Sequence, residues 1–373
     1  MRPPLADPDA PLRVAHLMQY FITGGLERMV HGLATGARPV VESIALAYVE
    51  DGPTRAMLER DGTRTFLYPP RTGRRLGLPL WIGRLLRRER IELLHTHHLG
   101  PFMYGAPVAR ALGIPVVHTE HSLEFYDAPR RRRVGRLMPK LATVTCVGPS
   151  LAAWREEHFG DRPVSIRNGI AVPDTVGAEP RAAARARLGL PADAFVVGTV
   201  ARLGPEKDLP TLVRAFARLG DPQAHLVVVG KGPEADRIAD AVAEAELGDR
   251  AHLLGERLDV ADLLPAFDVF GLTSEREGLP LAVLEAMAHA VPFVATAVGE
   301  LPTLAERGAG VVAPVGDVEG LAALLRSYRH APAARAAAGQ AARALVQAEY
   351  SRAVMVERYL DIYRQVTGRR LAR

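Results

Sequence analysis

The chain has 373 residues, too many for one ordinary domain, so its length predicts two. Hydrophobic residues make up 48% and charged residues 24%, as in an ordinary globular protein, and no apolar run reaches about 18 residues, which predicts no transmembrane helix. The formal net charge is +5, carried mostly by arginine.

The N-terminal residues and the cysteine content bear on where the protein works. Residues 1–11 are rich in proline and aspartate and lack the apolar core of a signal peptide, so we expect a short flexible tail. Cys146 is the only cysteine, which excludes an internal disulfide and favours the reducing cytoplasm. It lies in an apolar segment and is interpreted as a core residue.

Much of the positive charge falls in two clusters of arginine. A solvated surface is the first interpretation. The alternative is peripheral docking at the inner face of a membrane, where each cation near anionic lipid contributes about 1 kcal/mol. Nucleic-acid binding is disfavoured, because no aromatic interleaving or nucleic-acid motif accompanies the charge. The clusters are Arg71, Arg74, Arg75, Arg84, Arg87, Arg88 and Arg90, and the run Arg130, Arg131, Arg132 and Arg133.

The first half of the chain alternates short apolar segments with helical patterns. This alternation predicts a parallel sheet covered by helices on both faces, which binds ligands beyond the carboxyl ends of its strands. Gly24 and Gly25 follow the first strand, where they would let the backbone approach a ligand or would simply form a tight turn. The predicted strands are Leu12–Met18, Ser43–Val49, Thr65–Tyr68, Ile91–Thr96, Val116–Thr119, Thr143–Val147 and Arg162–Asn168.

Histidines gather at two of these strand ends. One group is His95, His97 and His98, and the other is His118 and His121. Imidazoles are common metal ligands, but no helical H-E-x-x-H spacing exists and no carboxylate partner is clearly placed. A polar rim that faces a ligand explains the histidines equally well, so we predict no metal. His121 ends a strand where a catalytic cleft would lie.

A second alternation of strands and helices predicts a second parallel-sheet domain. We expect the first domain over residues 12–172, a linker over 173–180 and the second domain over 181–348. A C-terminal helix is expected over 349–373. The strand Phe195–Ala201 precedes a loop with Arg202 and Lys207, which would clamp a diphosphate beside a helix N-terminus. The alternative is a pair of surface salt bridges, with Glu206 and Asp208 as partners.

A glycine-rich turn with Gly230 and Gly232 follows the strand His225–Val229. It has neither the G-x-G-x-x-G spacing nor the G-K-[ST] ending, so it is not a Walker loop. We expect it to pass its backbone close to a base or ribose. The later predicted strands are Ala251–Gly255, Asp268–Thr273, Pro292–Thr296 and Gly310–Ala313, and helices are predicted over Leu321–Val346 and Arg352–Gln365.

The most informative segment joins a polar turn to an apolar helix. Glu277 lies in the turn, Pro280 suits the first helical position, and Glu285 is the one carboxylate in the helix, about 8 Å along its axis from Pro280. A buried carboxylate needs hydrogen-bond partners, and the helix N-terminus between the two attracts phosphate. The spacing fits a nucleotide sugar, with hexose, diphosphate and ribose in that order. A structural Glu285, bonded within its own domain, is the equal alternative.

At these residues the chain resembles the GT-B glycosyltransferases of the large retaining family four. The resemblance runs from about Leu12 to Tyr363, and its most specific part is the Glu, seven residues, Glu motif at Glu277 and Glu285. The segment A-M-A-H-A-V-P-F-V-A-T after Glu285, the Gly-Gly loop, T-E-H-S, N-G-I, Arg202 and Lys207 also match. The resemblance implies two Rossmann-like domains facing a cleft, with the C-terminal helix crossing back to the first domain.

The resemblance also implies residue roles. Glu285 would bind the ribose, Glu277 and His121 the donor sugar, and Arg202 and Lys207 the diphosphate. Backbone amides near Gly278, Leu279, Pro280 and Leu281 would assist. Gly24 and Gly25 would lie close to the phosphates or to the acceptor. Gly299-Glu300 departs from the family pattern, where many members carry a second glycine, which leaves the sugar open.

The function implied is retaining, metal-independent transfer of a hexosyl unit from a nucleotide-diphosphate sugar, without a further cofactor. The acceptor would be a polysaccharide, a glycolipid or another hydroxyl compound. A non-catalytic nucleotide-sugar-binding subunit and a sugar-nucleotide epimerase on the same architecture are the alternatives.

Overall fold

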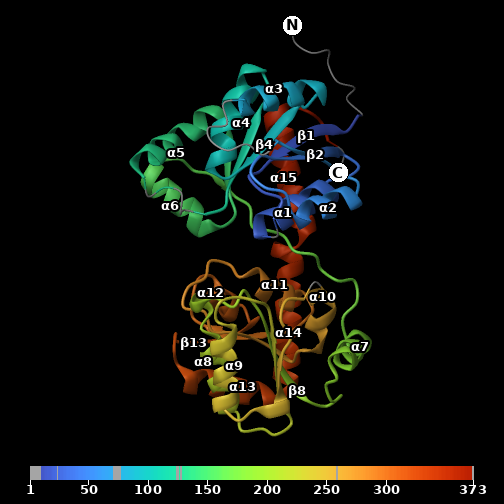
Figure 1. The fold of residues 1–373 in the computed structure, drawn as a ribbon, viewed down its shortest axis with the longest axis vertical. Helices are drawn as coiled ribbons and strands as arrows, with labels where there is room; N and C mark the ends of the chain where they lie inside the picture. The colour runs from blue at the N-terminus through green and yellow to red at the C-terminus, as the bar shows by residue number, and fades with distance from the viewer. Residues whose placement is uncertain are drawn as a thin grey trace. The chain divides into compact units, whose positions relative to one another are not determined.

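The structure is a computed structural model that describes residues 10–22, 24–69, 77–122, 126, 128–257 and 259–371. The chain divides into two compact units, residues 1–169 with 351–373, and residues 170–350 (Figure 1). The segment expected as a linker, 173–180, falls in unit 2, where a helix already begins at Ala178. Most of the expected tail, and Arg71, Arg74 and Arg75, lie outside the described residues.

Unit 1 is built on a seven-stranded parallel sheet in the order β3-β2-β1-β4-β5-β6-β7. Central β1 pairs on both sides, with Ala15 opposite Ile44 of β2 and Leu94 of β4. Helices cover both faces of the sheet, so its central strands are buried, including the polar residues of β4 and β5. The elements are β1 (Leu12–Leu17), α1 (Gly25–Gly36), β2 (Val41–Ala47), α2 (Pro53–Arg60), β3 (Arg64–Leu67), α3 (Leu78–Arg88), β4 (Leu93–His97), α4 (Leu99–Ala111), β5 (Val116–Glu120), α5 (Pro129–Leu141), β6 (Thr143–Cys146), α6 (Pro149–Phe159), β7 (Val164–Ser165) and α15 (Arg352–Thr367).

Helix α15 belongs to unit 1 although unit 2 precedes it in the chain. It begins at the N-cap Ser351, whose hydroxyl accepts from the amide of Val354, and ends at Gly368 in the left-handed conformation. Its apolar face joins a core cluster with β1 and α1, as its place among the blue elements of Figure 1 indicates. Tyr359 and Tyr363 of this helix are completely buried.

Unit 2 has a six-stranded parallel sheet in the order β10-β9-β8-β11-β12-β13. Central β8 pairs through Val197 with Leu226 of β9 and with Val269 of β11. The elements are α7 (Ala178–Leu188), β8 (Phe195–Val200), η2 (Pro205–Lys207), α8 (Leu209–Ala217), β9 (Ala224–Val229), α9 (Ala235–Glu244), η3 (Gly248–Arg250), β10 (Ala251–Leu253), α10 (Val260–Leu263), η4 (Leu264–Ala266), β11 (Val269–Leu272), α11 (Leu281–Ala288), β12 (Phe293–Thr296), α12 (Leu301–Glu306), β13 (Gly310–Ala313), α13 (Val318–His330), α14 (Pro332–Leu345) and η5 (Val346–Tyr350).

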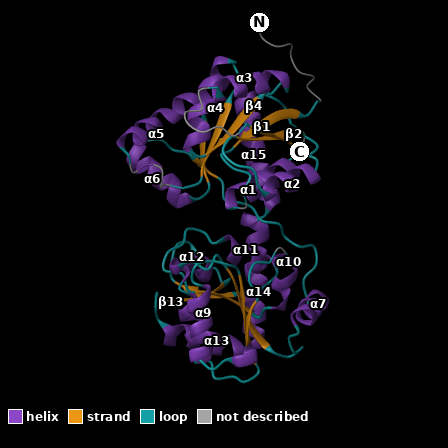
Figure 2. Ribbon diagram, in the orientation of Figure 1, coloured by secondary structure: helices purple, strands orange, loops and turns teal. Residues whose placement is uncertain are grey.

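The predicted fold class is confirmed, since each unit is a parallel sheet flanked by helices (Figure 2). Two element predictions are wrong. The helix expected over 321–346 is two helices, because Pro332 opens α14 and cannot continue α13. The strand expected over 162–168 is reduced to Val164–Ser165, a short edge strand that pairs only with β6 among the described residues.

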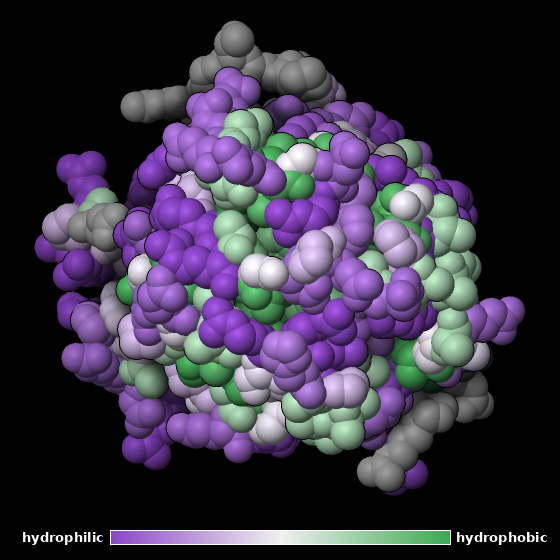
Figure 3. Space-filling model, turned by 90° about the horizontal axis from the view of Figure 1, so that it is seen from below, coloured by the Kyte–Doolittle hydropathy of each residue, from purple (hydrophilic) through white to green (hydrophobic). Residues whose placement is uncertain are grey.

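Two surface properties bear on function. Among the described residues, no helix combines the length and the apolar character needed to cross a membrane. On the face drawn in Figure 3, polar residues predominate and apolar residues are scattered between them.

Cys146 is buried, as predicted, and burial raises the pKa of its thiol to about 12.

Candidate functional site

Two loops of unit 2 meet at the carboxyl ends of neighbouring strands. The loop after β8 carries Lys207 and the loop after β11 carries Glu277, and β8 pairs with β11. Lys207 Nζ donates to Glu277 Oε1 at 2.6 Å, and Ser274 Oγ donates to the same oxygen at 2.7 Å. The Lys207 and Glu277 side chains are 20% and 10% exposed. The structure therefore brings together a cation and a carboxylate that the sequence placed 70 residues apart.

Side-chain and backbone bonds hold the loop after β8 in place. Asp208 has a φ of 40°, a left-handed conformation that turns the chain into α8. Thr273 Oγ1 donates to the carbonyl oxygens of Lys207 and Asp208, at 3.2 and 2.9 Å. The amide of Glu275 donates to the carbonyl of Glu206 at 2.9 Å. The backbone around Lys207 is thus fixed by the loop that carries Glu277.

Arg202 lies differently from Lys207. Its side chain is 63% exposed and donates to Glu206 Oε1 at 2.6 Å, so the salt bridge considered from the sequence is present here. Lys207 does not pair with Asp208 and pairs with Glu277 instead. An exposed ion pair contributes only about 0.2–1 kcal/mol, so an anionic ligand can displace Glu206 from Arg202 at little cost.

Helix α11 is less buried than its sequence predicts. Leu281, Ala282 and Glu285 are partly exposed and share one side of the helix, while Val283 and Leu284 are buried. Glu285 therefore lies on the partly exposed stripe, although the sequence suggested a buried carboxylate.

Two other details differ from expectation around α11. Pro280 is the N-cap rather than the first helical residue, with φ −72° and ψ 111°. Leu279 is partly buried and Gly278, which is exposed, has open space where a side chain would be. The first amides of α11 have no partner within the helix, as at any helix N-terminus.

Glycines of unit 2 hold loops together. Gly299 has a φ of 57°, and a Cβ there would lie 2.2 Å from the carbonyl oxygen of Gly278. The amide of Glu300 donates to that same oxygen at 3.0 Å, so the Glu277 loop rests on Gly299 and Glu300. Cβ atoms on Gly230 and Gly232 would lie 1.8 and 2.4 Å from the carbonyl oxygens of Ala201 and Leu203. The backbone after β8 therefore lies too close to Gly230 and Gly232 to leave room for a side chain at either position.

Unit 1 has a cavity of about 430 Å³ where its strands end. Segments after β1, β4, β5, β6 and β7, and the first turn of α1, supply its walls. It contains the predicted Gly25 and His121. His98 on this wall has a φ of 70°, an uncommon conformation for a residue with a side chain. The lining residues are Gln19, Tyr20, Ile22, Gly25, Leu26, Glu27, His98, His121, Ser122, Val147 and Asn168.

The sequence analysis assigned no role to Glu27, which is 6% exposed at the wall of this cavity. Burial raises the pKa of its carboxyl, and a hydrogen bond from its own backbone opposes the shift. A Cβ on Gly24 would lie 2.6 Å from Glu27 Oε2, so Gly24 makes room for this carboxylate. The sequence signal that could have identified Glu27 was its position, because Gln19, Glu27 and Asn168 all follow strand ends.

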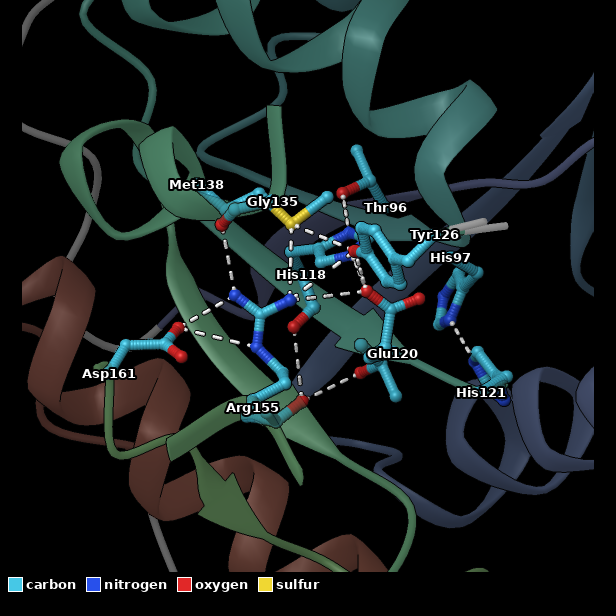
Figure 4. A network of polar contacts seen from close by, with 12 residues as sticks. Thr96, His97, His118, Glu120, His121, Tyr126, Gly135, Met138, Arg155 and Asp161 are labelled. Carbon is cyan, nitrogen blue, oxygen red and sulfur yellow. Dashed lines mark hydrogen bonds and ion pairs between the residues drawn. The ribbon is translucent and has the colours of Figure 1, made fainter. Parts of the chain in front are cut away.

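A chain of hydrogen-bonded imidazoles leads from the core of unit 1 to this cavity. Ser43 Oγ lies 3.4 Å from His16 Nε2, His16 Nδ1 lies 3.3 Å from His97 Nε2, and His97 Nδ1 lies 3.3 Å from His121 Nε2. Figure 4 shows the last of these contacts. Burial lowers the pKa of His16 to about 3 and holds the pKa values of His97 and His121 well below 6.5. Near neutral pH these rings are neutral, so each donates from one nitrogen and accepts at the other.

Two of these rings, together with His95, are also the candidate metal ligands among the described residues. One nitrogen each of His16, His95 and His97 lies within 4.8 Å of the others, and all three side chains are buried. Both nitrogens of His95 bond to protein groups, Nδ1 to Tyr363 Oη at 2.8 Å and Nε2 to Thr119 Oγ1 at 2.7 Å. The rings thus serve as a polar core under α15.

An enclosed ionic network fixes the strand end that precedes His121. Glu120 and Arg155 side chains are both fully buried, with Arg155 Nη1 3.4 Å from Glu120 Oε2 (Figure 4). Arg155 Nη2 also bonds to Asp161 Oδ2 at 2.7 Å and to the carbonyl of Gly135 at 3.1 Å. Burial alone would raise the pKa of Glu120, but His118, Tyr126 and Arg155 together hold this pKa below its usual value.

Comparisons with known proteins agree with this arrangement. The family described as glycosyl transferases group 1 matches residues 180–345, and the one described as glycosyltransferase family 4 matches residues 23–172. The D-inositol 3-phosphate glycosyltransferase of Kineococcus radiotolerans is 32% identical over 320 residues, 75% of this chain and 73% of the relative. The 2-deoxystreptamine N-acetyl-D-glucosaminyltransferase of Streptomyces fradiae is 31% identical over 315 residues, 76% and 73% of the two chains.

Solved structures extend the likeness to the whole fold. The Anabaena protein HepE, solved in complex with UDP, has a TM-score of 0.84 at 21% identity, over 95% of this chain and 100% of that one. A glycosyltransferase from Rickettsia africae also has a TM-score of 0.84, at 16% identity, over 95% and 98%. The chain therefore belongs to the group 1 glycosyltransferases of family 4, and its two units are the Rossmann-like domains of the GT-B fold.

Proposed function

We propose that this glycosyltransferase moves a hexosyl unit from a nucleotide-diphosphate sugar to a hydroxyl acceptor, with retention of configuration and without a metal. The observation that carries the proposal is the bond between Lys207 and Glu277 beside the N-terminus of α11. This corner of unit 2 offers cations and helix amides to a diphosphate and a carboxylate to sugar hydroxyls. HepE, which has this fold, was solved with UDP, which supports a nucleotide as part of the ligand.

The roles follow from charge. When the bond from the anomeric carbon to the phosphate oxygen breaks, negative charge develops on the diphosphate. Lys207, Arg202 and the first amides of α11 are placed to stabilise that charge, which lowers the barrier. Glu277 accepts from hexose hydroxyls and Glu285 from the ribose. The acceptor oxygen bonds to the anomeric carbon on the same face, and its proton passes to the leaving phosphate.

The acceptor class is drawn from the relatives. One is named for inositol 3-phosphate and another for 2-deoxystreptamine, and both names denote ring compounds with hydroxyl groups. We extend this to a carbohydrate or glycolipid acceptor, bound in unit 1 at the cavity with His121 on its wall.

Donor binding is tested by thermal unfolding with UDP-, GDP- and ADP-sugars in turn. A ligand that binds only the folded state raises the unfolding temperature. At 100 times its Kd, it adds about 2.7 kcal/mol to the free energy of unfolding. We expect one of the three series to stabilise the protein. Failure of all three would overturn the proposed donor class.

Replacement of Lys207 tests the assigned chemistry. We expect Lys207→Ala to lower kcat at least about tenfold, because charge stabilisation in the transition state is lost. Lys140→Ala is the matched control, since Lys140 is exposed on α5 of unit 1. Equal turnover of the two variants would discard the role of Lys207. Release of free nucleotide distinguishes transfer from a binding subunit, and conversion of the donor without acceptor would indicate an epimerase.

We also propose peripheral contact with anionic membrane through α5, at the cytoplasmic face. Arg130, Arg131, Arg132 and Arg133 are exposed on this helix, and Leu137 is 50% exposed among them. Co-sedimentation with phosphatidylglycerol vesicles is expected at low salt and should weaken as salt screens the charges. Absence of co-sedimentation at low salt would contradict the proposal.

A further inference from the structure

The cavity of unit 1 has an unusual charge composition for a site that would face phosphorylated compounds. Of its eleven described lining residues, none is lysine or arginine, and Glu27 is the one acidic residue. Burial lowers the pKa of His98 to about 4 and holds the pKa of His121 well below 6.5, so neither ring supplies positive charge near neutral pH.

Glu27 has no partner among the described side chains that would account for its burial. Its carboxyl is bonded to its own backbone, and no described lysine, arginine or hydroxyl donates to it. Burying a carboxylate is costly unless it is well hydrogen-bonded, and at 6% exposure this one has a bond from its own backbone and little water contact. Since Glu27 lines the cavity, a ligand that enters can supply the missing donors. Gly24 keeps the carboxylate in place by leaving space beside Oε2.

The other polar groups that line the cavity can also form hydrogen bonds with hydroxyl groups of a ligand. Gln19 and Asn168 each offer donors and an acceptor, and Ser122 offers a hydroxyl. The volume, about 430 Å³, falls in the range of about 300–1,000 Å³ typical of small-molecule sites. Each of these groups can bond to an uncharged hydroxyl, and none neutralises an anion.

We propose that this cavity selects an uncharged polyhydroxyl ring as acceptor, whose hydroxyls donate to Glu27, and that it rejects the same ring when it carries phosphate or carboxylate. The proposal rests on the proposed function, and it selects within the acceptor class given there. Among the described lining residues no positive charge offsets Glu27, so a phosphate or carboxylate on the ring would meet only like charge when Glu27 is ionised.

Binding is measured on the full chain by saturation-transfer NMR with matched pairs, myo-inositol against myo-inositol 1-phosphate and glucose against glucose 6-phosphate. We expect the uncharged ring to bind at least about tenfold more tightly than its phosphate, because like charges repel strongly in a partly desolvated site. Glu27→Gln should weaken binding of the uncharged ring and reduce the discrimination. Glu357→Gln, at an exposed position of α15, should leave both unchanged.

Gly24→Ala provides a second variant, because its Cβ would displace the Glu27 carboxylate without removing it. It should reproduce the effect of Glu27→Gln. Phosphorylated rings that bind as tightly as their parents, or a Glu27→Gln variant with unchanged preference, would overturn the proposal. If a nucleotide sugar stabilises the protein but neither ring of a pair binds, this proposal is overturned and the proposed function still stands. If the rings bind but no nucleotide sugar stabilises the protein, the proposed function alone is contradicted.

Discussion

At the scale of single residues, the most constrained charge is Arg155. It is fully buried and bonds to Glu120, Asp161 and the carbonyl of Gly135. Removing one partner of a buried ion pair is strongly destabilising, because it leaves an uncompensated charge. The network therefore fixes the end of β5, and with it the position of the next residue, His121.

Arg155→Met tests this network. We expect a loss of about 3–5 kcal/mol in the free energy of unfolding, because Glu120 would remain buried, and Asp161 partly buried, without their partner. Both tryptophans, Trp81 and Trp154, lie in unit 1, so denaturant unfolding followed by their fluorescence reports this unit.

Arg162→Met is the matched control. The Arg162 side chain is 86% exposed and pairs with Glu156 at 2.7 Å, so its loss should cost less than about 1 kcal/mol. Equal costs for the two variants would show that the buried network does not stabilise unit 1.

At the scale of elements, many strands could be predicted because both faces of each sheet are covered, which leaves short apolar runs such as Phe195–Val200 in the sequence. The loops that carry chemistry are different. Lys207 and Glu277 were found through position and family resemblance, whereas Glu27 was missed because its burial depends on how α1 begins above the strand ends. The partial exposure of Glu285 was missed for a similar reason, since alanines on either face of α11 look alike in sequence.

Gly299→Ala tests how the Glu277 loop is supported. A Cβ at this position would collide with the carbonyl of Gly278, so we expect the loop to shift and stabilisation by a nucleotide sugar to fall. Gly248→Ala is the control, because Gly248 also has a positive φ, 53°, but faces open space. Both should lose about 1–2 kcal/mol to the left-handed backbone. Equal nucleotide-sugar stabilisation in the two variants would contradict the role of Gly299.

At the scale of the whole molecule, unit 1 should lose stability in acid. Unit 1 holds a cluster of buried histidines whose pKa values are lowered by burial, to about 3 for His16 and about 4 for His98. Above pH 6.5 these rings are neutral in both the folded and unfolded states. As the pH falls below 6.5, the unfolded chain takes up protons that the folded unit does not, so stability is lost.

We therefore expect the tryptophan-monitored midpoint of unit 1 to fall steadily between pH 6.5 and about 4. Each such histidine contributes up to about 1.4 kcal/mol per pH unit. His16→Gln should make the dependence shallower, even where it lowers stability at pH 7. A midpoint that stays level, or rises, on acidification would show that the ring cluster is accessible to protons in the folded state.

The return of α15 to unit 1 has a consequence for synthesis. Residues 170–350 form a contiguous unit and leave the ribosome before Ser351–Arg373 exist. Until then Thr119 and His95 lack the hydroxyls of Tyr359 and Tyr363, and one face of β1 and α1 lacks its apolar cover. Unit 1 is thus begun first and completed last, so the nascent chain carries an unfinished N-terminal sheet while unit 2 folds behind it.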